Sequence, residues 1–177
     1  MSFLNNKIIL GTAQFGNKYG VTNNINLNKD KSKLILTHAI SEGINTLDVS
    51  PDYNNFEIFD KLKLHRIKII SKFDTRERIK NKEKNLLFNK ILKDLKLLNS
   101  NNLEGLLFRK PVLLKNNNNL WNQALLLREK DIIKKIGYTV YAPEELDAVI
   151  RNFMPDIVQL PFNIFDRRFE NTGWLDR

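Results

Sequence analysis

Short apolar runs alternate with longer amphipathic segments along the whole chain. Runs of this length that end at glycine, proline or polar residues are typical of buried strands, whereas apolar residues at helical spacing predict helices. Gly43 follows the first helical segment at the position of a left-handed C-terminal cap. We predict strands at 7–12, 44–49, 67–73, 105–108, 133–140 and 156–160, and helices at 29–42, 56–62, 81–98, 120–129 and 143–153.

This alternation of strands and helices predicts βαβ units around a parallel sheet. Such a sheet is either open and doubly wound or most of a (β/α)8 barrel. An open sheet with a dinucleotide site would carry G-x-G-x-x-G after an early strand, and the sequence has no such motif. We therefore predict the α/β class, a parallel TIM-barrel type with about six βα units present, in one domain over residues 1–177.

Composition excludes several kinds of function. The chain has no cysteine and two histidines, so we predict no disulfide and no metal site. The N-terminus lacks a leader pattern and no apolar run reaches membrane-spanning length, which predicts a cytoplasmic protein without a membrane partner. The net charge is +9, but lysines are scattered among acidic residues, as on a solvated face. We predict no nucleic-acid partner, although a positive field favours an anionic ligand such as a nucleotide phosphate.

Three residues at the ends of the second and third predicted strands are candidates for chemistry: Asp48, Tyr53 and Lys72. Active sites of parallel α/β folds lie at this end of the strands. The lysine ammonium would stabilise the tyrosine phenolate, and the aspartate carboxylate would orient the lysine. Together the three residues would let the tyrosine act as a general acid that protonates a carbonyl oxygen as the carbonyl carbon accepts a hydride. The alternative is a salt bridge at the rim beside an unrelated loop tyrosine. The residues alone leave both interpretations open.

Two further positions suggest a ligand. Gln159 lies inside the apolar run D-I-V-Q-L-P, where a buried amide needs hydrogen-bond partners. Gly137, followed by Thr139 at the end of the fifth predicted strand, allows a flat ligand to approach the backbone. Each residue also has a purely structural interpretation.

Six motifs in this order resemble the aldo-keto reductase family. They are L-G-T-A-Q-F-G at 10–16, G-I-N-T-L-D-V-S-P-D-Y at 43–53, I-I-S-K-F at 69–73, G-L-L-F-R-K-P at 105–111, I-G-Y-T-V-Y at 136–141 and D-I-V-Q-L-P-F-N-I-F-D-R-R at 156–168. The resemblance implies a TIM barrel that binds NADP(H) without a Rossmann domain and reduces a small aldehyde or ketone.

The resemblance also implies roles for individual residues. Tyr53 matches the family's proton donor, with Lys72 and Asp48 as its partners, while Asn54 stands where a glycine is common. The fourth catalytic position of the family is a histidine, and Arg109 stands there. Arginine stays charged and donates hydrogen bonds but has no neutral imidazole form, so we expect reduced or altered activity.

The cofactor site implied by the resemblance comprises five residues. Thr139 and Gln159 match the residues that hold the nicotinamide carboxamide. Gly11, Thr12 and Asp48 belong to the same implied site.

The length departs from the family pattern. A (β/α)8 barrel takes about 250 residues, and this sequence ends after its sixth predicted strand. The resemblance therefore implies a C-terminally truncated member that lacks the last two strands and late cofactor loops. An unclosed barrel exposes sheet edges, so we expect self-association or a complementing fragment. The alternative function is a non-catalytic fragment or interaction module on the same scaffold.

Overall fold

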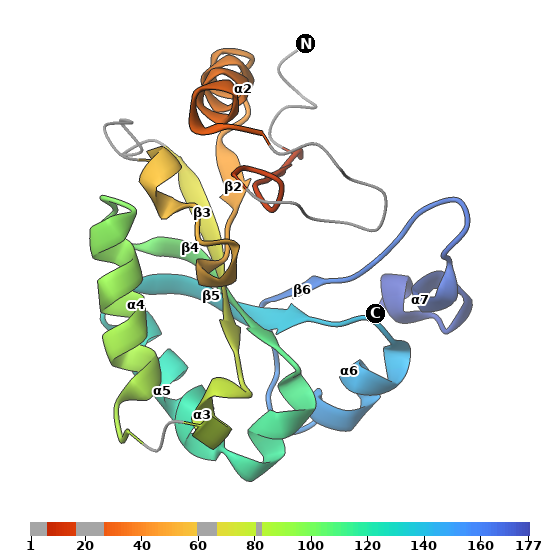
Figure 1. Cartoon of the computed structure of the whole chain (residues 1–177). Coiled ribbons are helices and arrows are strands. Elements are labelled where there is room, and N and C mark those ends of the chain that lie inside the picture. Colours follow the sequence, from red (N-terminus) through yellow and green to blue (C-terminus); the bar gives the residue numbers. More distant parts are fainter. Residues whose placement is uncertain (1–6, 17–26, 60–66, 81–82) are drawn as a thin grey trace. The chain divides into compact units, whose positions relative to one another are not determined.

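A computed structural model describes residues 7–16, 27–59, 67–80 and 83–177 of the chain (Figure 1). These residues belong to two compact units. One unit comprises residues 1–72 and 91–104, and the other comprises residues 73–90 and 105–177. The single domain that the sequence predicts over residues 1–177 stays a prediction.

Six strands are hydrogen-bonded to one another in the order of the sequence, with helices between them. The pairs β1–β2, β2–β3 and β5–β6 are parallel. This arrangement confirms the predicted α/β class with six βα units of the (β/α)8 type. The strands are β1 (Leu10–Gly11), β2 (Thr46–Asp48), β3 (Lys68–Asp74), β4 (Leu103–Arg109), β5 (Ile133–Thr139) and β6 (Ile157–Gln159).

The α-helices follow the predicted order, with changes at their ends. They are α2 (Lys29–Ser41), α3 (Glu77–Lys80), α4 (Leu86–Leu97), α5 (Asn118–Glu129), α6 (Pro143–Val149) and α7 (Arg168–Asn171). Helices α3 and α7 were not predicted, because four residues are too few to show a helical period. Of the predicted helices at 56–62 and 81–98, residues 60–62 and 81–82 lie outside the described residues.

Four 3-10 segments complete the described structure: η1 (Pro51–Tyr53), η2 (Phe56–Phe59), η4 (Pro111–Asn116) and η5 (Trp174–Asp176). The first two lie in the connection after β2, and η2 occupies residues 56–59 of the short helix that the sequence predicts at 56–62. The third begins at a proline, which is preorganised for the first position of a helical turn.

Helix α2 shows how local sequence sets the boundaries of an element. The Asn28 side chain accepts a hydrogen bond of 2.9 Å from the backbone N of Lys31 and caps the first turn. Gly43 has φ 89°, as the predicted left-handed cap requires. The buried face carries Leu36 and Ala39, which pack toward the core of the first unit, whereas Leu34 is exposed.

Aromatic side chains form the core of the second unit. Trp121 on α5 packs against Phe108 of β4, Tyr138 of β5 and Phe153, with ring centroids 6.1, 5.9 and 5.5 Å apart. Phe73 extends the cluster through an edge-to-face contact with Phe108. The Tyr138 hydroxyl donates to the Phe153 carbonyl oxygen, and burial raises the pKa of Tyr138 far above its usual value.

Gly137 is required by the β5–β6 pairing. A Cβ atom at this position would lie 1.8 Å from the Ile157 carbonyl oxygen of β6. The backbone that approaches Gly137 on this side is therefore the neighbouring strand, which supplies a structural reason for the glycine.

Replacing Gly137 by alanine is expected to destabilise the protein by about 1–3 kcal/mol, because β6 must move away from β5 to admit the methyl group. Urea unfolding of Gly137→Ala measures this loss. Gly11→Ala is the matched control, since a Cβ there meets nothing within 4 Å. Equal stability of the two variants would contradict the steric argument.

Candidate active site

Asp48, Tyr53 and Lys72 lie together in the first unit. The Lys72 Nζ atom donates one hydrogen bond to Asp48 Oδ1 and another, 3.3 Å long, to the Tyr53 hydroxyl oxygen. The side chains of Lys72 and Asp48 are 6% and 14% exposed, and Tyr53 is half-buried. A shielded ammonium therefore links a carboxylate to a phenol, as the sequence predicts for a general-acid site.

The connection after β2 positions the phenol. Ser50 Oγ accepts a hydrogen bond of 3.3 Å from the Asp52 backbone N, and Pro51 opens the 3-10 turn that ends at Tyr53. The next residue, Asn54, adopts the left-handed conformation with φ 47° and ψ 40°. Glycine and asparagine tolerate this conformation best, so Asn54 meets the same backbone requirement as the glycine that is common there in the family.

The arrangement suits transfer of a proton at the tyrosine oxygen. The ammonium adjacent to that oxygen stabilises the phenolate that remains when the proton leaves. The Asp48 carboxylate holds the ammonium in position through a charge-assisted hydrogen bond. Tyr53 itself is partly exposed, whereas Lys72 is buried.

Thr12 forms two hydrogen bonds to the backbone of Asp48 at the end of β2. Its backbone N and its hydroxyl both donate to the Asp48 carbonyl oxygen, at 3.1 and 2.9 Å. The side chain is fully buried. Gly11, by contrast, is exposed and pairs with Asp48 in the β1–β2 register.

Asn55 is a site-supporting residue that sequence reasoning missed. Its Nδ2 atom donates to the carbonyl oxygens of Thr12 and Phe15, at 2.9 and 3.0 Å, and the residue is 2% exposed. These bonds tie the segment after β1 to the segment after β2, next to Tyr53. In the sequence Asn55 belongs to an Asn-Asn pair in a polar turn, a pattern that also describes an ordinary solvent-exposed loop.

Arg109 lies in the second unit at the end of β4. Its carbonyl oxygen accepts hydrogen bonds from the backbone N and the hydroxyl of Thr75, at 3.3 and 2.8 Å. The same hydroxyl bonds the Lys110 carbonyl oxygen at 2.8 Å, and Lys110 is left-handed with φ 54°. Thr75, which sequence reasoning also missed, therefore fixes the backbone on which Arg109 lies.

Asp74 in the same unit is nearly buried, and its carboxylate is strongly paired. Arg76 donates from Nε at 2.9 and 3.0 Å and from its backbone N at 2.9 Å. The side-chain hydrogen bonds from Arg76 lower the pKa of Asp74 below its usual value of 3.8, despite the opposing effect of burial, and the Arg109 charge lowers it further.

This pairing predicts an acid-sensitive contribution to stability. A folded-state pKa below the unfolded value means that the contribution is complete above about pH 4 and disappears as the pH falls through the folded pKa. Asp74→Asn is therefore expected to lower the free energy of unfolding at neutral pH and to flatten its decline in acid. Urea unfolding at several pH values between neutral and strongly acidic measures both effects. An unchanged acid dependence would contradict the assignment.

Thr139 and Gln159 lie side by side at the ends of β5 and β6. They are partners in the parallel register, and the Thr139 hydroxyl donates to Gln159 Oε1 at 3.0 Å. Thr139 is 5% exposed and Gln159 is half-buried. The pair presents a hydroxyl and an oriented primary amide at the end of the strands where parallel folds bind ligands.

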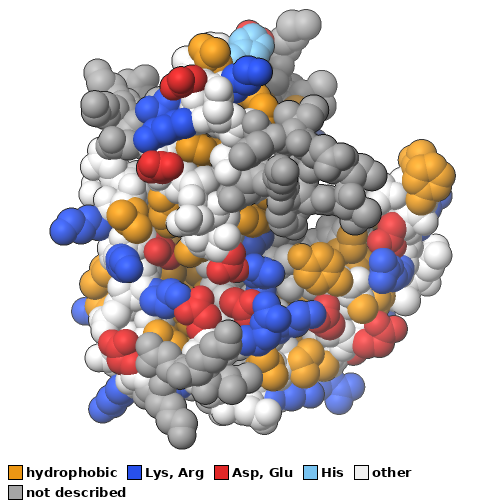
Figure 2. Space-filling model, in the orientation of Figure 1, with side chains coloured by type: hydrophobic (Ala, Val, Ile, Leu, Met, Phe, Trp, Pro, Cys, Tyr) orange, Lys and Arg blue, Asp and Glu red, His pale blue; other side chains and the backbone are white. Residues whose placement is uncertain are grey.

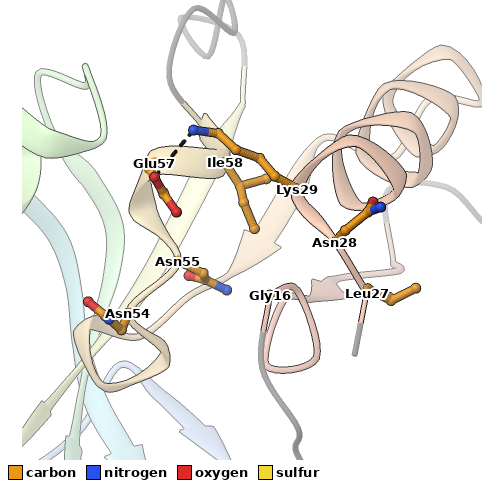
Figure 3. A pocket seen from close by; sticks show the side chains of 8 residues that line it. All are labelled: Gly16, Leu27, Asn28, Lys29, Asn54, Asn55, Glu57 and Ile58. Atoms are coloured by element: carbon orange, nitrogen blue, oxygen red, sulfur yellow. Dashed lines mark hydrogen bonds and ion pairs between the residues drawn. The ribbon is translucent and has the colours of Figure 1, made fainter. Parts of the chain in front are cut away.

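A separate pocket of about 210 Å³ lies in the first unit (Figure 3). Its walls do not include Asp48, Tyr53 or Lys72. Lys29 Nζ and Glu57 Oε2 form an ion pair of 3.3 Å across it, so the two charges in its wall neutralise each other. The lining residues are Gly16, Leu27, Asn28, Lys29, Asn54, Asn55, Glu57 and Ile58.

The described residues contain neither a membrane-spanning helix nor a group of metal ligands. Across these residues, no helix has the length and apolar character needed to span a membrane. The described His, Asp and Glu side chains also form no cluster of three or more that could hold a metal ion.

A family model identifies the family of this chain, and solved structures share its fold. The model of the Aldo/keto reductase family matches residues 7–176. No curated protein is significantly similar to the chain in sequence. Solved structures with the same fold include an aldo-keto reductase from Bacillus halodurans, with a TM-score of 0.75 and 16% identity over 94% of this chain and 56% of that one.

Two other solved structures are similar. An aldo/keto reductase from Brucella melitensis has a TM-score of 0.69 and 17% identity over 95% of this chain and 64% of its own. A variant of the protein Gox0644 in complex with NADPH has a TM-score of 0.58 and 17% identity over 81% of this chain and 48% of its own. The chain thus spans about half to two thirds of the length of these structures.

Proposed function

Because the chain belongs to the aldo/keto reductase family, we propose that its site performs NADP(H)-dependent reduction of an aldehyde or a ketone. The observation that carries the proposal is the pair of hydrogen bonds that Lys72 donates to Asp48 and to the Tyr53 hydroxyl.

In this proposal Tyr53 gives its proton to the carbonyl oxygen of the substrate. Bound NADP(H) supplies the hydride that the carbonyl carbon accepts. Lys72 stabilises the tyrosine phenolate through its charge, and Asp48 keeps Lys72 oriented toward it. Asn55 and Thr12 hold the two loops that bear these groups, and so act as positioning residues.

Thr139 and Gln159 fit the carboxamide of a nicotinamide ring. A carboxamide presents one acceptor oxygen and two N–H donors, and a hydroxyl with a primary amide offers the complementary groups. The hydrogen bond between the two side chains fixes the orientation of the glutamine amide. NADPH in the similar Gox0644 structure supports the choice of cofactor.

Thr12 and Gly11 are less suited than Thr139 and Gln159 to hydrogen-bond the cofactor through their side chains. Thr12 has its hydroxyl committed to the Asp48 carbonyl oxygen and is fully buried. We therefore assign Thr12 a role in positioning Asp48. Gly11 is exposed with open space where a side chain would be, which suits close approach of a ligand to the backbone.

Replacing Arg109 by histidine is expected to raise turnover by about tenfold or more, because a neutral imidazole can donate a hydrogen bond to the substrate oxygen without a fixed charge. Steady-state kinetics of Arg109→His with a fixed aldehyde measures the gain. Arg151→His, a change of the same type at an exposed residue outside the site, is the control. Equal turnover of Arg109→His and the parent chain would show that residue 109 does not act on the substrate oxygen.

NADPH binding to the purified 177-residue chain is the direct test. Saturable binding by nucleotide fluorescence, followed by NADPH consumption with a panel of small aldehydes and ketones, would support the proposal. A folded chain that binds no NADPH would instead favour the non-catalytic interaction module. Circular dichroism on the same sample establishes that the chain is folded.

A further inference from the structure

The pocket of the first unit contains a hydrogen-bond acceptor without a donor. Asn55 lines this pocket and is 2% exposed. Its Nδ2 atom uses both donor positions on the carbonyl oxygens of Thr12 and Phe15, so the amide cannot be turned over. Within the described part of the chain, Asn55 Oδ1 is buried and accepts no hydrogen bond. Leaving a buried carbonyl oxygen unpaired is costly, so this amide favours a ligand that donates.

The N-terminus of α2 forms the opposite side of the pocket. Asn28 and Lys29 line it there, across from Asn55 in Figure 3. The Asn28 side chain caps the N–H of Lys31, the third residue of the helix. An α-helix leaves its first N–H groups without intrahelical acceptors, which here are those of Lys29 and Asp30. These groups and the helix dipole favour a carboxylate at this side of the pocket.

The pocket wall carries both signs of charge but no net charge. Lys29 Nζ and Glu57 Oε2 are 3.3 Å apart, and their side chains are 44% and 72% exposed. Figure 2 shows basic and acidic side chains interspersed on the visible face of the molecule, rather than gathered by sign. A ligand with a net charge is attracted by one member of the ion pair and repelled by the other. A ligand that carries one charge of each sign matches both.

The size of the pocket sets an upper limit for the ligand. Its volume is about 210 Å³, which corresponds to several water molecules at about 30 Å³ each. Pockets for drug-sized ligands measure about 300–1,000 Å³. This pocket therefore suits a molecule much smaller than a nucleotide.

We propose that the pocket binds a small zwitterion of the α-amino acid type. The ammonium of the ligand donates to Asn55 Oδ1, and its carboxylate lies at the N-terminus of α2 beside the Lys29 ammonium. An unpaired acceptor, a helix N-terminus and a neutral ion pair thus each match one property of the same ligand. The inference is independent of the proposed reductase activity, because it concerns a pocket whose walls exclude Asp48, Tyr53 and Lys72.

Titration of the full chain with glycine, followed by two-dimensional ¹H–¹⁵N NMR, tests the proposal. Saturable shifts are expected at the backbone amides of residues 27–29 and 54–58. The dissociation constant should be on the order of 1 mM, because so small a ligand makes few contacts. Methylammonium and acetate each carry one of the two charges, so they should bind about tenfold more weakly than glycine.

Two outcomes of the titration would overturn the proposal. Absence of these shifts with glycine would show that the pocket holds water alone. Binding of methylammonium or acetate as tight as that of glycine would show that the pocket does not select a zwitterion.

Glu57→Gln tests the role of the ion pair. The change keeps the size of an exposed side chain, so the fold should be retained, but it leaves the Lys29 charge without its partner. Acetate should then gain relative to glycine, and the ratio of their dissociation constants should fall by about fivefold. Glu129→Gln, at an exposed residue of α5, is the matched control and should leave the ratio unchanged. An unchanged ratio in Glu57→Gln would contradict the proposed match of charges.

Discussion

Replacing Tyr53 by phenylalanine is expected to lower carbonyl turnover by roughly 10²–10⁴-fold, the usual contribution of a positioned general acid. The change removes the hydroxyl oxygen that accepts a hydrogen bond from Lys72 and leaves the ring in place. Because the residue is half-buried and the bond is long, stability should change by less than about 1 kcal/mol. NADPH affinity should be preserved, because the proposed nicotinamide contacts lie at Thr139 and Gln159.

Steady-state and single-turnover kinetics on the same substrate measure the effect. Tyr141→Phe is the control, because Tyr141 is 52% exposed and lies outside the proposed site. Parent-level turnover by Tyr53→Phe would show that Tyr53 is not the proton donor, whether or not the chain binds NADPH.

Replacing Lys72 by methionine is expected to destabilise the protein by about 3–5 kcal/mol. Methionine fills a similar volume, but the Asp48 carboxylate loses the ammonium with which it pairs, and its side chain is only 14% exposed. A shielded charge without that partner is costly, whereas the pair itself adds little net stability. The additional change Asp48→Asn should recover much of the loss.

Urea unfolding of Lys72→Met and of the double variant measures these energies. Lys29→Met is the matched control, since it breaks an ion pair whose side chains are 44% and 72% exposed. Exposed pairs contribute at most about 1 kcal/mol. Equal losses from Lys72→Met and Lys29→Met would show that the site pair behaves as a surface pair.

The parallel sheet and the closeness of Asp48 to Lys72 could be predicted because both depend on local pattern. An apolar run that ends at Asp48 and another that contains Lys72 place both residues near one end of neighbouring parallel strands. The 3-10 turn that brings Tyr53 to Lys72 follows from the proline and serine before it.

The roles of Gly137, Asn55 and Thr75 depend on tertiary contacts, which a local sequence pattern does not predict. Gly137 suggested a ligand close to the backbone, but the Ile157 carbonyl oxygen approaches it, because strand register sets that distance. Asn55 and Thr75 bond carbonyl groups more than thirty residues away in the sequence. Strand ends also shifted: β2 is Thr46–Asp48, whereas the sequence predicts a strand at 44–49.

The tryptophan fluorescence of this chain reports on only one of its two compact units. Both tryptophans of the chain, Trp121 and Trp174, belong to the unit of residues 73–90 and 105–177. Trp121 is 8% exposed among Phe108, Tyr138 and Phe153, so its emission should shift to longer wavelength when this unit opens to water. Far-ultraviolet circular dichroism reports on the helices of both units. Intrinsic fluorescence and circular dichroism, followed in one denaturation series, therefore distinguish cooperative unfolding of the whole chain from stepwise unfolding, without any added label.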